Sequence, residues 1–434
     1  MNYSETITYL YSRLPMFTKI GASAIKKDLT NTISFCRTLG DPQKKFKSIH
    51  VGGTNGKGST SHMLAAILQK AGYKTGLYTS PHLRDFRERI RVNGEMISEE
   101  QVVEFVGTRK QTIETIEPSF FEVTVAMAFD HFANEEVDIA VIEVGLGGRL
   151  DSTNIITPLL SVITNIGLDH VNLLGDTLPK IAFEKAGIIK PGIPVVIGEK
   201  QKEVANVFLE KARQVGSPIS FASERWDISL LEDKGVQSQE LELLHLEATS
   251  KEMNGTLSLS LDLTGIYQLK NVKTVLEAVE RLREQKFRIA ADDVRSALSE
   301  VKNLTGLMGR WQVLGTDPLT ICDTGHNEDG IKEVVKNLSS QKYDKLHMII
   351  GMVKDKEIGK VLKLLPKDAS YYFCQPDLER AKPYLELLLE ARAEGLQGEG
   401  FPTVKSALEA ARKAAGSGDL IFIGGSTFVV AEVV

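Results

Sequence analysis

The sequence has few cysteines, no long apolar stretch and no excess of positive charge. Its three cysteines, Cys36, Cys322 and Cys374, are far apart and form no CxxC pair, which fits neither a disulfide framework nor a zinc site. No run of about 18 apolar residues occurs, so no segment is expected to span a membrane. Met1–Lys19 lacks the basic start and apolar core of a signal peptide, so we expect a cytoplasmic protein.

The net charge of −5 argues against a nucleic-acid-binding protein, which normally has a basic surface. With 434 residues, of which 42% are hydrophobic, the chain is long enough for two domains with separate cores. An acidic chain that acts on anionic substrates would need metal ions and local cationic clusters to attract them.

Short apolar strands alternate with amphipathic helices between about residues 46 and 220. Continuous apolar runs such as Ile139–Ile142 predict a mostly parallel sheet that is covered on both faces. The predicted strands are Phe46–Gly52, Lys74–Thr79, Asp138–Val144, Leu160–Asn165 and Pro194–Ile197. The predicted helices are Lys57–Ala71, Ser98–Ile116, Phe121–Ala133, Thr177–Ile188 and Lys202–Gln214.

The pattern changes at Trp226–Thr264, where leucines alternate with polar residues after the hairpin signal Asn254-Gly255. This stretch is predicted to be a small antiparallel addition to the first domain. The α/β alternation restarts near Val301–Met308, so we divide the chain into an N-terminal P-loop α/β domain (1–303) and a smaller C-terminal Rossmann-like α/β domain (304–434). Further strands are predicted at Leu319–Cys322, Leu346–Gly351, Tyr371–Cys374 and Leu420–Ile423, and helices at Leu269–Glu284 and Ala291–Ser299.

A glycine-rich turn joins a predicted strand to a predicted helix at His50–Thr60 (HVGGTNGKGST). Such a turn can serve tight packing, but the strand, the loop, the lysine and the helix together favour a phosphate-binding loop. Lys57 would reach the β- and γ-phosphates, and a hydroxyl of Ser59 or Thr60 could approach phosphate or metal. The residues predicted to bind ATP here are Gly53, Thr54, Asn55, Gly56, Lys57, Gly58, Ser59 and Thr60.

Two polar side chains are predicted at the carboxyl ends of neighbouring strands. Glu143 ends an apolar strand, where either Mg²⁺ or a salt bridge to Arg149 could compensate its charge. His170 follows the strand Leu160–Asn165. A lone histidine is more often structural, but this place at the sheet edge favours a ligand.

Two other sets of charged residues have ordinary interpretations. Lys185 lies on a short helix beside Glu184, and its pattern alone favours a surface ion pair. A group of arginines follows Ser80-Pro81-His82, and Asp85 and Glu88 interleave with it. This mixture of charges favours a solvated face over a face that attracts the substrate, except near His82. The arginines are Arg84, Arg87, Arg89 and Arg91.

Several strings, in order over nearly the whole chain, resemble folylpolyglutamate synthase and its bifunctional dihydrofolate synthase relatives in the Mur ligase superfamily. The most specific is EVGLGGRLDSTN at Glu143–Asn154. The others are His50–Thr60, Thr79–Leu83, Ile163–His170, Ile181–Gly192, Gly309–Trp311 and Asp323–Asn327. The chain departs from the usual family pattern at Tyr267, which replaces a histidine, and in Asp323–Glu328 (DTGHNE).

The resemblance implies roles for particular residues. Ser80 and Glu143 would bind one Mg²⁺, and Glu143 with His170 a second. Lys185 matches a lysine that is carbamylated in the family and helps to organise the metal region. The positions that match nucleotide contacts are Asn271, Arg310, Asp323 and His326, with His326 and Lys57 also catalytic, and Ser426 and His82 match the substrate side.

The resemblance also implies an activity, the ATP-dependent joining of L-glutamate to a folate-type carboxylate through an acyl phosphate. The substrates would be tetrahydrofolate, dihydropteroate or both, together with glutamate and ATP, and the protein would be a monomer. A Mur-type ligase of a non-folate carboxylate, a P-loop kinase or NTPase, and a non-catalytic binding protein are the alternatives. Glutamate-dependent ATPase activity separates the enzyme from the binding protein.

Overall fold

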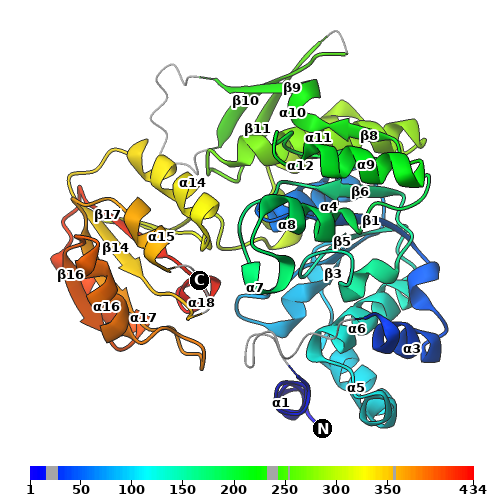
Figure 1. Cartoon of the computed structure of the whole chain (residues 1–434), viewed down its shortest axis with the longest axis horizontal. Coiled ribbons are helices and arrows are strands. Elements are labelled where there is room, and N and C mark those ends of the chain that lie inside the picture. The colour runs from blue at the N-terminus through cyan, green and yellow to red at the C-terminus, as the bar shows by residue number, and fades with distance from the viewer. Residues whose placement is uncertain (16–27, 232–242, 253–254, 355–357) are drawn as a thin grey trace. The chain divides into compact units, whose positions relative to one another are not determined.

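The computed structural model describes residues 1–15, 28–231, 243–252, 255–354 and 358–434, which form two compact units (Figure 1). Unit 1 comprises Met1–Gly167, Val171–Asp262 and Gln268–Leu307. Unit 2 comprises Met308–Val434 and two short stretches, Leu168–His170 and Leu263–Tyr267. Within the described ranges, every helix is too short or too polar to traverse a lipid bilayer.

An eight-stranded sheet forms the centre of unit 1, in the order β4-β3-β2-β5-β1-β6-β7-β8. Neighbours from β2 to β8 are parallel, and β3 and β4 add an antiparallel edge. The predicted, mostly parallel sheet is therefore confirmed. Its strands are β1 (Lys47–Gly52), β2 (Thr75–Tyr78), β3 (Ile90–Val92), β4 (Glu95–Met96), β5 (Ile139–Glu143), β6 (Leu160–Ile163), β7 (Val195–Ile197) and β8 (Ile219–Phe221).

Some helices of unit 1 begin with a capping box. Ser98 and Gln101 form a capping box at the start of α5, and Ser119 and Glu122 form one at the start of α6. Aromatic residues of α6, among them Phe129 and Phe132, share one core with residues of α1, α3 and α5, whereas α4 packs against α11 and α12. The helices are α1 (Tyr3–Arg13), α3 (Thr30–Thr38), α4 (Lys57–Lys70), α5 (Glu99–Ile116), α6 (Phe120–Asn134), α7 (Val171–Leu174), α8 (Leu178–Ala186), α9 (Ala205–Val215), α10 (Ala222–Arg225), α11 (Gln268–Glu284), α12 (Ala291–Leu298) and α13 (Val301–Thr305).

A second, three-stranded antiparallel sheet belongs to unit 1, as predicted from the leucine alternation. Leu259 and Leu261 are buried on one of its faces. Its strands are β9 (Trp226–Leu230), β10 (Leu244–Ser250) and β11 (Thr256–Leu261). Asn254 of the predicted hairpin signal lies outside the described residues.

Unit 2 contains a six-stranded sheet in the order β12-β13-β17-β14-β15-β16, in which β12 alone is antiparallel to its neighbour. The four strands predicted in this domain are confirmed, and β12 and β16 were not predicted. The strands are β12 (Gln312–Thr316), β13 (Leu319–Cys322), β14 (Leu346–Ile350), β15 (Ser370–Cys374), β16 (Gly398–Phe401) and β17 (Leu420–Gly424). The helices are α14 (Glu328–Ser339), α15 (Ile358–Leu364), α16 (Tyr384–Ala393), α17 (Val404–Ala414) and α18 (Thr427–Ala431).

Candidate active site

The glycine-rich loop of unit 1 connects the end of β1 to the start of α4, the arrangement that a phosphate loop requires. Gly53 and Gly56 have positive φ angles of 137° and 84°. A Cβ atom would collide with Thr164 Oγ1 at the first position and with Asn271 Oδ1 at the second. Because only glycine fits at either position, the loop can approach its neighbours closely and point its backbone toward a ligand.

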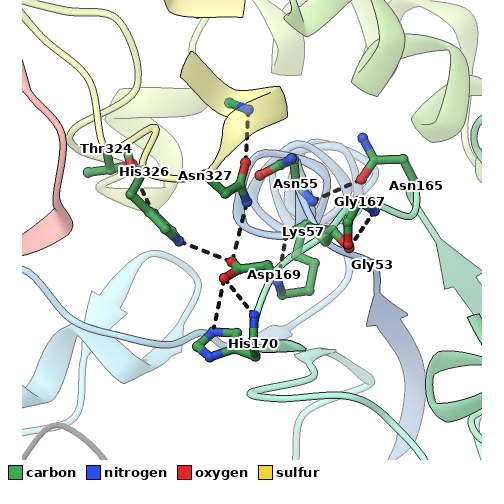
Figure 2. A network of polar contacts seen from close by, with 12 residues as sticks. Gly53, Asn55, Lys57, Asn165, Gly167, Asp169, His170, Thr324, His326 and Asn327 are labelled. Carbon is green, nitrogen blue, oxygen red and sulfur yellow. Dashed lines mark hydrogen bonds and ion pairs between the residues drawn. The ribbon is translucent and has the colours of Figure 1, made fainter. Parts of the chain in front are cut away.

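The end of β6 holds the loop in place. The backbone carbonyl of Asn165 accepts a hydrogen bond from the N–H of Thr54 at 2.9 Å. The side-chain oxygen of Asn165 accepts one from the N–H of Asn55, also at 2.9 Å (Figure 2). The Thr54 hydroxyl accepts the N–H of Gly167 at 2.9 Å. Lys57 Nζ donates to the Thr54 carbonyl at 3.1 Å, so its ammonium group lies on the loop that it is predicted to serve.

The first turn of α4 contacts the start of α11. Gln268 Nε2 donates to Ser59 Oγ at 3.1 Å, and Asn271 Nδ2 donates to Gln268 Oε1 at 2.7 Å. All three side chains are buried. Asn271, predicted as a nucleotide contact, is therefore brought beside the loop, and Gln268 is a supporting residue that the sequence did not single out.

Glu143 is the buried acid at the end of β5, with 4% of its surface exposed. The backbone N–H of Ser80 donates to Glu143 Oε2 at 3.4 Å, so these two predicted metal ligands are neighbours. Arg149 does not pair with Glu143, since its guanidinium is bonded to Glu184 at 2.9 Å. The salt-bridge alternative for Glu143 is therefore wrong.

This donor set fits Mg²⁺, which commonly takes one or two protein oxygens and completes its shell with phosphate oxygens and water. No group of three or more acidic, histidine or cysteine side chains in the described part of the chain could hold a metal by itself.

Lys185 does not lie on the surface, and the predicted pair with Glu184 is wrong. Its side chain is only 5% exposed, and its Nζ donates to the carbonyl of Gly53 at 2.8 Å. Glu184 instead forms an ion pair with Arg149. The structure therefore brings Lys185, from α8, to the phosphate loop.

The four arginines after Ser80 divide into two pairs: Arg84 is exposed and Arg87 is half-buried, whereas Arg89 and Arg91 are buried and do not belong to a solvated face. Arg89 Nε donates to His82 Nδ1 at 2.7 Å, and its guanidinium lies 5.3 Å from the centre of the Phe120 ring. The other ring nitrogen of His82 is 3.2 Å from the Tyr11 hydroxyl. Burial, with a smaller contribution from Arg89, lowers the pKa of His82 to about 3, so this histidine is neutral near pH 7.

Asp323 is the centre of a hydrogen-bond group in unit 2. Its Oδ2 accepts the Tyr267 hydroxyl at 2.6 Å and the Trp311 N–H at 2.8 Å, and its Oδ1 accepts the Gly325 N–H at 2.8 Å. Arg310 lies in the same group, bonded to Thr324 Oγ1. Tyr267 therefore has a definite partner at the position where the chain departs from the usual family pattern.

His326 lies next to this group. Its Nδ1 donates to the Thr324 carbonyl at 2.9 Å, and its Nε2 is 3.3 Å from Asp169 Oδ2. Asp169 was not predicted as a site residue, although it directly precedes His170 in the GLDH string. His170 groups with unit 2 and Glu143 with unit 1, so their sharing of one metal stays a prediction.

Ser426 precedes α18 and caps it, since its Oγ accepts the N–H of Phe428 at 3.2 Å. The side chain is buried at the carboxyl end of β17. A capping hydroxyl accepts one hydrogen bond and still has its own proton to donate, which is compatible with the predicted contact to a carboxylate substrate.

Two models of protein families match this chain. The Mur ligase middle domain matches residues 51–279, and the Mur ligase glutamate ligase domain matches residues 309–427. The first match contains the phosphate loop, Glu143 and Lys185. The second contains Arg310, Asp323, His326 and Ser426.

Curated relatives and solved structures agree with these domains. The dihydrofolate synthase/folylpolyglutamate synthase of Bacillus subtilis is 31% identical over 99% of this chain and 98% of its own length. A probable bifunctional folylpolyglutamate synthase/dihydropteroate synthase of Haloferax volcanii is 33% identical over 100% of this chain, which spans 50% of that relative.

Among solved structures, Escherichia coli FolC in complex with DHPP and ADP has a TM-score of 0.85 and 28% identity, covering 100% of this chain and 97% of that one. The bifunctional folylpolyglutamate synthase/dihydrofolate synthase of Yersinia pestis with AMPPNP and a Mn ion has a TM-score of 0.83 and 26% identity, with coverage of 100% and 97%. The chain thus belongs to the folylpolyglutamate synthase/dihydrofolate synthase family of Mur ligases.

Proposed function

We propose that this protein is an ATP-dependent ligase that joins L-glutamate to the carboxylate of a folate-type acceptor, either tetrahydrofolate, dihydropteroate or both. The observation that carries the proposal is the phosphate loop of unit 1, on which Lys57 and the buried Lys185 both donate to loop carbonyls. A regulatory NTPase would have no evident use for a second α/β unit with Arg310, Asp323 and His326. Full-length similarity to folate ligases supports the acceptor class.

In the proposed reaction, an oxygen of the acceptor carboxylate attacks the γ-phosphorus of ATP. The bond to the bridging oxygen breaks, which gives an acyl phosphate and ADP. The amine of glutamate then attacks the acyl carbon, and phosphate and a proton are released. Lys57 offsets the negative charge of the phosphates, and His326 orients the phosphate or takes the proton.

The proposed work is divided between two domains. Residues 1–303 would bind the nucleotide, and residues 304–434 would supply Arg310, Asp323 and His326 to it and Ser426 to glutamate. His82, close to the buried Arg89, would lie on the acceptor side. We further assign a cytoplasmic monomer, a compartment consistent with three cysteines that are all buried and unpaired.

The proposed cofactor is Mg²⁺ at two sites, one held by Ser80 and Glu143 and one by Glu143 and His170. When bound, Mg²⁺ would offset phosphate charge and polarise the γ-phosphoryl group. By its resemblance to the family, Lys185 would be carbamylated by addition of CO₂ to the amine with loss of a proton, and the carbamate nitrogen would still have one N–H for the Gly53 carbonyl. The resulting anion would help to hold the metal region.

Mass spectrometry of the products tests the function. The full chain is incubated with ATP, Mg²⁺ and glutamate, with dihydropteroate and tetrahydrofolate supplied separately, and Lys57→Ala serves as the matched control. We expect a glutamate-sized mass gain on at least one acceptor, absent from the control. If the folded wild-type protein binds ATP and extends neither acceptor, the folate assignment is wrong.

A further inference from the structure

Asp169 has no role in the reaction described so far, yet its carboxylate connects several polar groups of unit 2 (Figure 2). The side chain is 11% exposed. Its Oδ1 accepts the N–H of His170 at 2.8 Å, and its Oδ2 lies 3.3 Å from both His326 Nε2 and Asn327 Nδ2. A nearly buried carboxylate is costly without such partners, so these contacts account for its position.

The contact with Asp169 determines how His326 is oriented. The ring is 32% exposed, and its Nδ1 proton is already donated to the Thr324 carbonyl. The other ring nitrogen, Nε2, faces the carboxylate of Asp169 at 3.3 Å. An imidazole with partners for both nitrogens is held in one rotamer, whereas a ring of this exposure with one partner could turn toward solvent.

The position of Asp169 is itself well defined. Asn327, whose amide faces Asp169, also caps helix α14 by accepting the N–H of Gly330 at 2.8 Å. On the other side, His170 has a φ of 52°, a left-handed conformation that is unfavourable for a side chain with a Cβ. Non-glycine residues in this conformation persist where their surroundings impose it, and they concentrate at functional sites. The hydrogen bond from His170 N to Asp169 is one such constraint.

We propose that Asp169 is a positioning residue of the ligase reaction, which acts through His326 by holding its imidazole in the orientation needed at the phosphate. Asp169 itself would not touch the substrates. The inference rests on the function proposed above for His326. It adds a residue 157 positions away in the sequence that fixes this histidine.

The test is a double-mutant cycle with Asp169→Asn and His326→Ala. Asparagine keeps the size of the side chain and an oxygen for His170 N–H, but removes the charge that faces His326. We expect kcat of Asp169→Asn to fall roughly 10- to 100-fold, as for a catalytic group displaced by about 1 Å, with KM for ATP nearly unchanged. Because Asp169 acts through His326, the double variant should be no slower than His326→Ala alone.

Asp176→Asn is the matched control, because Asp176 is an exposed aspartate a few residues further along the chain that pairs with Lys180 at 2.8 Å. It should keep the wild-type kcat. If Asp169→Asn does not fold, Asp169→Glu takes its place, since its extra methylene displaces the carboxylate and should give the same loss and the same non-additivity with His326→Ala.

Three results would overturn the inference. Wild-type kcat in a folded Asp169 variant, with His326→Ala impaired, removes the role of Asp169 and leaves the proposed function intact. Losses that multiply in the double variant show that Asp169 does not act through His326. Wild-type kcat in His326→Ala refutes the role of His326 and the inference together, while glutamate addition by the wild-type enzyme would still establish the ligase.

Discussion

His50 provides a prediction in which the stability of unit 1 depends on pH. Its side chain is completely buried on β1, and its Nε2 donates to Thr153 Oγ1 at 2.8 Å. The Thr153 hydroxyl in turn donates to Asp151 at 2.5 Å. His50 therefore links the strand before the phosphate loop to the end of the EVGLGGRLDSTN string. We expect His50→Gln to make unit 1 less sensitive to acid, because glutamine keeps a donor for Thr153 and does not titrate.

The magnitude follows from the shift in the pKa. Burial, with a smaller effect of Lys190, lowers the pKa of His50 from 6.5 to about 3. The folded state favours the neutral ring, so this contribution to stability is complete above pH 6.5 and is lost as the pH falls from 6.5 toward 3. The loss begins near pH 6.5 and amounts to about 1.4 kcal/mol for each pH unit below it. Acidification from pH 7 to pH 5 should therefore lower the unfolding free energy of unit 1 by roughly 2 kcal/mol.

The sequence contains two tryptophans, Trp226 in unit 1 and Trp311 in unit 2, which makes the measurement specific. In a Trp311→Phe background, Trp226 fluorescence reports the urea unfolding of unit 1. The loss of stability between pH 7 and pH 5 should be roughly 2 kcal/mol smaller for His50→Gln than for its parent. His245→Gln, on the small sheet, is the matched control. An equal loss in parent and His50→Gln would refute the reasoning.

Three further predictions concern the site. Lys57→Ala should lower turnover at least about a hundredfold, because a charge that offsets the phosphates is lost. Its melting temperature should stay nearly unchanged, because the lysine bonds only to its own loop, and full activity in a product assay would contradict the phosphate-loop assignment. Glu143→Gln should raise the Mg²⁺ concentration needed for half-maximal activity at least about tenfold, whereas Glu184→Gln should not; equal Mg²⁺ titrations would remove Glu143 from the metal site. His170→Gly should be about 1 kcal/mol more stable than His170→Ala in urea unfolding, because φ is 52° there, and equal stability would show that the backbone relaxes.

The central strands of the two larger sheets were predictable because they are nearly continuous apolar runs, whereas the strands toward the edges, β8, β12 and β16 among them, were not predicted. β5 is buried at every residue, and its predicted and observed limits differ by one residue at each end. The β3–β4 hairpin was missed, although Asn93-Gly94 between short apolar segments is the usual signal for a two-residue turn. Both residues have positive φ angles, 49° and 85°, as such a turn requires.

The site was only partly predictable, because burial and partners are set by residues far away in the sequence. Lys185 has the pattern of a surface lysine, but its partner is the carbonyl of Gly53, 132 positions earlier. The arginines interleave with acids as solvated residues do, yet β3 lies within the main sheet and buries Arg91. The roles of Tyr267 and Asp169 follow only from their contacts with Asp323 and His326, which are distant in the sequence.

Unit 2 is assembled from three separate stretches of chain, which limits how this enzyme could be recombined with its relatives. Residues 308–434 are not a complete module, because Leu263–Tyr267 brings the phenol that binds Asp323 and Leu168–His170 brings the carboxylate that faces His326. In a chimera that exchanges only the C-terminal segment, the residues at positions 323 and 326 would come from one protein and their partners at positions 267 and 169 from the other. Gene fusions of this family should therefore tolerate a new C-terminal half best when residues 168–170 and 263–267 are transplanted with it.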